Sequence, residues 1–152
     1  MIEKDKILVL GLGNILMGDE GVGVKSIEYM KKQIMPENVD LLDGGTGGFH
    51  LLSLFDDYRK VILIDATIND GSIGEVSVIK PKFSSDFPRS LTSHDIGLKD
   101  LMQSAELIGD LPEMHLIIVN ILDLRDVGIG LSPDIEATLP LIYDKVLGIL
   151  NI

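Results

Sequence analysis

Four acidic residues and one histidine stand where their side chains could bind a metal ion. Asp19 and Glu20 follow the first apolar run of the chain and its glycine-rich turn. Asp43 follows the second apolar run, and Asp65 follows the third. His94 lies in the hydroxyl-rich stretch SLTSHD, where the residues alone leave a ligand role and a structural role equally open. One imidazole with two carboxylates suits a divalent transition metal such as nickel, zinc or iron.

The individual side chains differ in what the sequence indicates for them. Asp65 directly follows VILI, so we expect it at a half-buried strand end, where a charge without a partner is costly. That position favours a ligand or hydrogen-bonding role. Asp19 and Glu20 are adjacent, so we expect one to point into the site and the other to cap the first helix. Their spacing does not choose between them. His50 and His115 adjoin apolar residues and are expected to be structural.

Apolar runs alternate with amphipathic segments, which predicts the elements that position these side chains. Buried strands are predicted at 7–10, 39–42, 61–64 and 116–121. Helices are predicted at 21–33, with Ile34 on the apolar face, at 49–55, from His94 onward, and after Ser132. Ser132 is expected to cap this last helix, and Pro133 to occupy its first position. The segment 75–79 alternates like an edge strand, and its connection to the third strand is too short for a crossover helix, so it is predicted to be antiparallel.

Strands that alternate with helices predict an α/β fold, a three-layer α/β/α sandwich with a mostly parallel sheet. In such sheets the loops after the strands lie together at the carboxyl edge, where ligands bind. Glu20, Asp43 and Asp65 each follow a predicted strand end. We therefore expect these three carboxylates to share one edge of the sheet.

The composition limits the classes of protein and partner. A chain of 152 residues, 45% hydrophobic, is expected to form a single domain over residues 1–152. The net charge of −11 argues against nucleic acid as a partner, because phosphates would be repelled. The absence of cysteine excludes disulfides, zinc–thiolate sites and a thiol nucleophile. No signal segment and no membrane helix is predicted, so we expect a soluble cytoplasmic protein.

Common catalytic and nucleotide-binding motifs are incomplete or missing. The turn GLGN matches the first two glycines of a dinucleotide-binding fingerprint, but Leu16 replaces the third glycine. Asp19 and Glu20 would also repel a pyrophosphate there, which leaves a nucleotide-binding module as a weak alternative. The sequence contains neither the H-E-x-x-H motif of zinc proteases nor the G-x-S-x-G motif of serine hydrolases.

Four segments together resemble the nickel-iron hydrogenase maturation protease family: LVLGLGNILMGDEGVGV, LLDGGTGG, VILIDA and SHDIGL. They occur in the family's order and spread over most of the chain. The resemblance implies a twisted five-stranded sheet with one antiparallel strand, of the phosphorylase/hydrolase-like type, between layers of helices. The segment VNILDLRDVGIGLSP resembles the corresponding family loop only loosely.

This resemblance implies an endopeptidase that removes the C-terminal extension of a hydrogenase large-subunit precursor after nickel insertion. The family's metal-contacting residues correspond to Glu20, Asp65 and His94, with nickel carried by the substrate. Glu20 is thereby chosen over Asp19. Asp43 corresponds to the family's acid before the second glycine cluster and is expected to be an assisting acid or base, or to orient the GGTGG loop. Glu20 and Asp65 are also counted as catalytic, by aspartic-type or metal-assisted hydrolysis. A monomer is expected. The alternative from another class is a non-enzymatic nickel-binding assembly factor.

Overall fold

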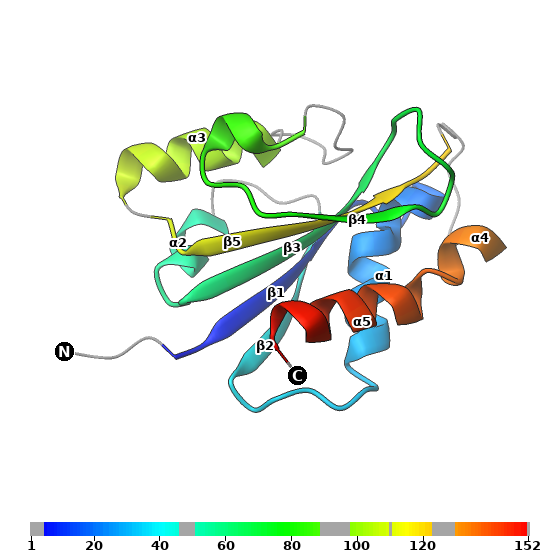
Figure 1. Cartoon of the computed structure of the whole chain (residues 1–152), viewed down its shortest axis with the longest axis horizontal. Coiled ribbons are helices and arrows are strands. Elements are labelled where there is room, and N and C mark those ends of the chain that lie inside the picture. Colours follow the sequence, from blue (N-terminus) through cyan, green and yellow to red (C-terminus); the bar gives the residue numbers. More distant parts are fainter. Residues whose placement is uncertain (1–4, 46–50, 89–97, 110, 123–129, 152) are drawn as a thin grey trace.

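The computed structural model describes residues 5–45, 51–88, 98–109, 111–122 and 130–151, which form a five-stranded mixed sheet between helices (Figure 1). The strands are β1 (Ile7–Leu12), β2 (Val39–Gly45), β3 (Lys60–Thr67), β4 (Val76–Ile79) and β5 (Glu113–Asn120). Their order in the sheet is β2-β1-β3-β5-β4. β4 runs antiparallel to β5, and the other pairs are parallel. The predicted α/β class and the single antiparallel edge strand are therefore confirmed.

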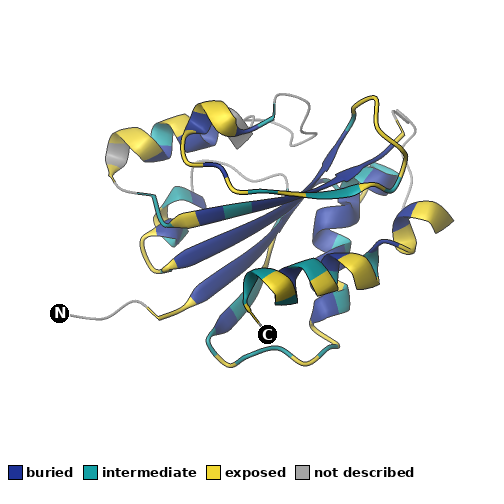
Figure 2. Cartoon of the chain, viewed as in Figure 1, coloured by how far each residue is buried: buried dark blue, intermediate teal, exposed yellow. Residues whose placement is uncertain are grey.

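Helices cover both faces of the sheet. Alternate residues of β1 and β3 belong to different clusters, because successive side chains of a strand point to opposite faces. One cluster joins Val9 and Ile62 to α1 (Val22–Met30) and α5 (Leu139–Ile149). The other joins Leu10 and Leu63 to α2 (Leu52–Phe55) and α3 (Leu98–Ile108). The buried colour in Figure 2 runs through the central strands and the inner sides of the helices. The three-layer arrangement follows from these two packed faces.

Two glycines let α1 lie directly against the central strands. A Cβ atom on Gly11 of β1 would stand 2.2 Å from the carbonyl oxygen of Gly23 in α1. A Cβ atom on Gly23 would stand 2.3 Å from the carbonyl oxygens of both Leu12 and Ile64. No side chain larger than hydrogen fits at either position. The start of α1 is thus held over the carboxyl ends of β1 and β3.

The first helix is shorter than predicted. α1 ends at Met30, and two tight turns follow it, in which Lys32 N–H donates to the Tyr29 carbonyl and Gln33 N–H to the Met30 carbonyl. Ile34 therefore lies outside the apolar stripe and is 90% exposed. The prediction that Ile34 lies on the apolar face of this helix was wrong. The apolar spacing continues to Ile34, but the helix ends several residues before Pro36, which disfavours helical backbone in front of it.

The last helix is divided into α4 (Pro133–Glu136) and α5. Pro140 stands at the second position of α5 and has no N–H to donate, so a continuous helix would lose a backbone hydrogen bond there. Ser132 occupies the capping position of α4, but its side chain makes no capping hydrogen bond. The predicted positions of Ser132 as N-cap and Pro133 as first helical residue are therefore confirmed, although the cap is made by the Ser132 backbone carbonyl and not by its side chain. Of the five residues expected on the buried stripe of this last helix, Ile135, Ile142 and Val146 are fully buried, whereas Leu139 and Ile149 are partly buried.

The described elements include no helix of the length and apolar character that crossing a membrane requires. The start of the predicted helix at His94, and residues 49 and 50 of the predicted helix at 49–55, lie outside the described residues.

Candidate functional site at the carboxyl edge of the sheet

Glu20 lies in η1 (Gly18–Gly21), a single 3-10 turn between β1 and α1. Its backbone N–H donates to the Met17 carbonyl at 3.3 Å, and its side chain is partly exposed. Gly13, with φ of +132°, lies behind this turn, where a Cβ atom would stand 2.0 Å from the Glu20 carbonyl oxygen. Any other residue at position 13 would be strained and would push the turn away. The glycines after β1 thus shape the backbone that carries Glu20.

Asp19, the other member of the acidic pair, has a different environment. It is only 6% exposed, and its carboxylate accepts two hydrogen bonds from Ser132. The Ser132 backbone N–H donates to Oδ1 at 2.7 Å, and the Ser132 hydroxyl donates to Oδ2 at 2.8 Å. Gly21 occupies the capping position of α1, and no side chain caps that helix. Asp19 is therefore not the cap that its position suggested, but a link to the segment before α4.

Asp65 is fully buried within β3, not half-buried at a strand terminus as predicted. The strand continues to Thr67 and pairs Asp65 with Ile118 of β5. One carboxylate oxygen accepts the Ala66 backbone N–H at 2.8 Å. By alternation along the strand, Asp65 belongs to the face of Leu63, which α2 and α3 cover.

Asp43 lies near the end of β2, an edge strand, and its side chain is exposed. Its carboxylate accepts the Gly45 backbone N–H at 2.8 Å, which closes a turn in which Gly45 adopts φ of +54°. In the sheet Asp43 is the register partner of Gly11. An exposed carboxylate on a stable turn is accessible to an extended substrate and to water.

The backbone brings the three acidic positions to one edge of the sheet. Gly11 pairs with Asp43 on one side and with Ile64, the neighbour of Asp65, on the other. η1 carries Glu20 immediately before α1, whose Gly23 touches the Ile64 carbonyl. Among the described residues no group of three acidic or histidine side chains could hold a metal. The predicted third ligand, His94, lies outside those residues, so the ligand set stays a prediction.

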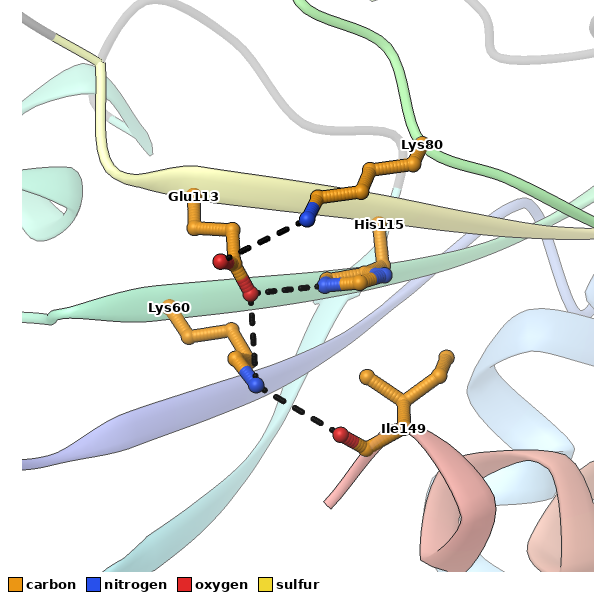
Figure 3. Close-up of polar contacts among 5 residues, drawn as sticks. All are labelled: Lys60, Lys80, Glu113, His115 and Ile149. Carbon is orange, nitrogen blue, oxygen red and sulfur yellow. Dashed lines mark hydrogen bonds and ion pairs between the residues drawn. The ribbon is translucent and has the colours of Figure 1, made fainter. Parts of the chain in front are cut away.

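A second charged cluster lies at the opposite edge, where β3 and β5 begin (Figure 3). Glu113 contacts Lys60 at 3.2 Å, Lys80 at 3.6 Å and His115 at 2.9 Å. Lys60 also donates to the Ile149 carbonyl at the end of α5. The hydrogen bond from His115, followed by Lys60 and Lys80, lowers the pKa of Glu113 to about 2. Lys60 therefore links the starts of β3 and β5 to the end of α5, and His115 adds a hydrogen bond to this cluster, in agreement with the structural role expected for it.

Comparison with known proteins gives a consistent result. A family model described as hydrogenase maturation protease matches residues 24–149. The hydrogenase 2 maturation protease of Escherichia coli is 31% identical over 96% of this chain and 91% of its own. The hydrogenase expression/formation protein HupD of Bradyrhizobium diazoefficiens is 33% identical over 88% of this chain and 72% of its own. Among solved structures, the hydrogenase maturating endopeptidase HybD from E. coli superimposes with a TM-score of 0.85 at 32% identity, covering 96% of this chain and 92% of that one.

Proposed function

Since the chain belongs to the hydrogenase maturation protease family, we propose that it is an endopeptidase that removes the C-terminal extension of a nickel-iron hydrogenase large-subunit precursor. The observation that carries this proposal is that the backbone positions of Glu20, Asp43 and Asp65 lie at the carboxyl edge of the sheet. That edge is where open α/β sheets bind their ligands. The protein is proposed to act as a monomer in the cytoplasm, after nickel has been inserted into the precursor.

Glu20, Asp65 and His94 are proposed to engage nickel that the precursor already holds. Carboxylate oxygens and an imidazole nitrogen are suitable ligands for nickel. The glycine support behind Glu20 favours its role, because it fixes the turn that carries this ligand. α3 begins four residues after His94 and covers the sheet face that carries Asp65. A requirement for nickel would ensure that only an assembled precursor is cleaved.

Cleavage is proposed to proceed by attack of a water molecule on the scissile carbonyl. The water oxygen bonds to the carbonyl carbon, the C–N bond breaks, and the water's proton is transferred to the leaving amine. Asp43 is suited to accept and return this proton, because it is exposed at the same edge. A second route has the substrate's nickel polarise the water or the carbonyl. Asp43 would then serve to orient the loop that follows it.

The test is a processing assay on a purified precursor with and without nickel, read by mass spectrometry. We expect loss of the C-terminal extension only from the nickel-loaded precursor. Glu20→Gln, Asp65→Asn and His94→Ala should each reduce processing at least about 100-fold. His115→Ala is a matched control at the opposite edge of the sheet and should process normally. Normal processing by all three site variants would contradict the assignment.

The precursor mass tests one alternative function, and a binding measurement tests the other. An assembly factor without protease activity would bind nickel but leave the precursor mass unchanged. A nucleotide-binding module would bind a dinucleotide saturably without any divalent metal, which calorimetry on the metal-free protein would detect.

A further inference from the structure

We propose that Asp19 is a positioning residue, which holds the turn that carries Glu20 through its buried contact with Ser132. This inference rests on the proposed function of Glu20. It gives the two adjacent acids separate tasks, one toward the substrate and one toward the protein. Ser132, which the sequence suggested only as a helix cap, becomes part of the support of the site.

Ser132 makes two short hydrogen bonds to the Asp19 carboxylate. Both carboxylate oxygens are used, at 2.7 and 2.8 Å, and the carboxylate is almost fully shielded from water. Hydrogen bonds to a charged group are about twice as strong as neutral ones, and low exposure strengthens them further. The two residues are separated by 113 positions in the sequence. The contact therefore ties the turn after β1 to the segment that enters α4.

The backbone of the turn makes few hydrogen bonds of its own: Met17 N–H donates to the Asn14 carbonyl at 3.0 Å, and Val22 N–H donates to the Asp19 carbonyl. η1 is four residues long, has no side-chain cap, and contains Gly18 in the left-handed region with φ of +59°. The Glu20 N–H to Met17 carbonyl distance of 3.3 Å is at the long end for a hydrogen bond. Hydrogen-bond geometry in 3-10 turns is poorer than in α-helices. The two bonds from Ser132 to the Asp19 carboxylate thus add a restraint from outside the turn.

Two close backbone contacts also limit the movement of the turn. Gly13 lies against the Glu20 carbonyl, and a Cβ atom on Gly21 would stand 2.8 Å from the Ile15 backbone. These contacts prevent the turn from moving toward β1 but do not prevent it from moving away. The Asp19 carboxylate supplies the opposing restraint, because Ser132 lies on a different segment of the chain. Loss of this restraint would loosen the backbone that carries Glu20, and misplacement of a reacting group by about 1 Å can cost about 100-fold in rate.

Three variants probe this restraint. Ser132→Ala removes the hydroxyl bond but keeps the backbone bond, Asp19→Ala removes both, and Ser132→Thr keeps a hydroxyl in the same place. Asp86→Ala is the matched control, because Asp86 also accepts two hydrogen bonds, from the backbone N–H groups of Lys82 and Phe83. Asp86 belongs to η3 (Ser84–Asp86), next to Glu106 of α3 and away from the proposed site.

The first measurement is cleavage of the nickel-loaded precursor, with kcat and KM separated. We expect Asp19→Ala to lower kcat about 10- to 100-fold with little change in KM, and Ser132→Ala to lower it less. Ser132→Thr should restore most of the rate, and Asp86→Ala should leave kcat unchanged even where it lowers the melting temperature. A normal kcat in Asp19→Ala would overturn the proposal.

The second measurement does not depend on activity. Hydrogen–deuterium exchange of the amides at residues 17–21 should accelerate in Asp19→Ala and Ser132→Ala, while β3 stays protected. If the wild-type protein fails to cleave any precursor, the proposed function fails, and exchange alone decides whether Asp19 holds the turn. Unchanged exchange in both variants would overturn the positioning role whatever the outcome of the cleavage assay.

Discussion

At the scale of single residues, the acids of the carboxyl edge differ most in exposure. Asp65 is completely buried and Asp19 nearly so, whereas the Asp43 side chain is exposed. Buried carboxylates are bound to the fold as well as to any ligand, so their removal combines loss of stability with loss of function. Within the described part of the chain, the hydrogen bond of Asp43 is the one that it accepts from the Gly45 N–H, in its own turn. It is therefore the acid whose chemistry can be tested with the least disturbance of the structure.

Asp43→Asn is expected to slow cleavage of the precursor without destabilising the protein. The asparagine carbonyl can still accept the Gly45 N–H, so the free energy of unfolding should change by less than about 0.5 kcal/mol. The lost proton acceptor should lower kcat by about 100-fold or more if Asp43 acts as the base. Cleavage kinetics and a denaturant titration measure the two quantities. A normal kcat would assign water activation to the metal route instead.

The lowered pKa of Glu113 predicts that the protein loses stability at low pH. Its folded-state pKa of about 2 lies below the ordinary value of 4.5, chiefly because of the hydrogen bond to His115. The ionised form is thus favoured by folding, and its contribution is complete above about pH 5 and lost as the pH falls toward 2. The side chain is 42% exposed, so solvent screening limits the effect to about 1 kcal/mol or less.

The measurement for Glu113 is the free energy of unfolding from pH 6 to pH 2 in wild type and Glu113→Gln. The wild type should lose more stability over this interval than the variant, because the variant cannot titrate at this position. Parallel curves for the two proteins would show that the Glu113 cluster adds nothing to stability.

At the scale of elements, the position of α1 over β1 and β3 depends on glycine. Gly23→Ala should destabilise the protein by about 1–3 kcal/mol, because a Cβ atom would meet two backbone carbonyl oxygens at 2.3 Å, which no side-chain rotation can relieve. The shift of α1 should also displace Glu20 and reduce cleavage. Thermal unfolding and the processing assay measure these effects.

Gly148→Ala is the matched control for Gly23→Ala. Gly148 lies in α5, and a Cβ atom there would meet nothing within 4 Å. Alanine is favoured over glycine in a helix, so this variant should gain about 0.5–1 kcal/mol. Equal changes in stability in Gly23→Ala and Gly148→Ala would show that the close approach of α1 at Gly23 does not affect the stability of the fold.

The elements also show which features the sequence could predict. The antiparallel edge strand β4 was predictable, because the chain between Thr67 and Val76 is too short for a crossover helix. The break between α4 and α5 was not, because the apolar spacing of Ile135 and Ile142 runs through it without interruption. The contact of Asp19 with Ser132 was also missed, because local spacing carries no information on pairs so distant along the chain. The position of His94 remains a prediction from family resemblance.

At the scale of the whole molecule, the two edges of the sheet have separate electrostatic characters. The amino edge pairs its charges, with Lys60, Lys80 and His115 gathered around Glu113 (Figure 3). The carboxyl edge gathers Glu20, Asp43 and Asp65, which adds to an already negative chain. An acidic edge of this kind attracts cations and discourages polyanions.

The net charge of −11 predicts that salt stabilises the fold. Repulsion between like charges extends about 30 Å at 0.01 M ionic strength but only about 8 Å at 0.15 M. The melting temperature should therefore rise between these two conditions, since the compact state suffers more from repulsion than the unfolded chain. A variant with Glu37→Lys, Asp56→Lys and Asp144→Lys carries less negative charge and should show a smaller rise, because all three acids are exposed. A fall in melting temperature with salt would mean that ion pairs such as Lys60 with Glu113 outweigh the repulsion across the molecule.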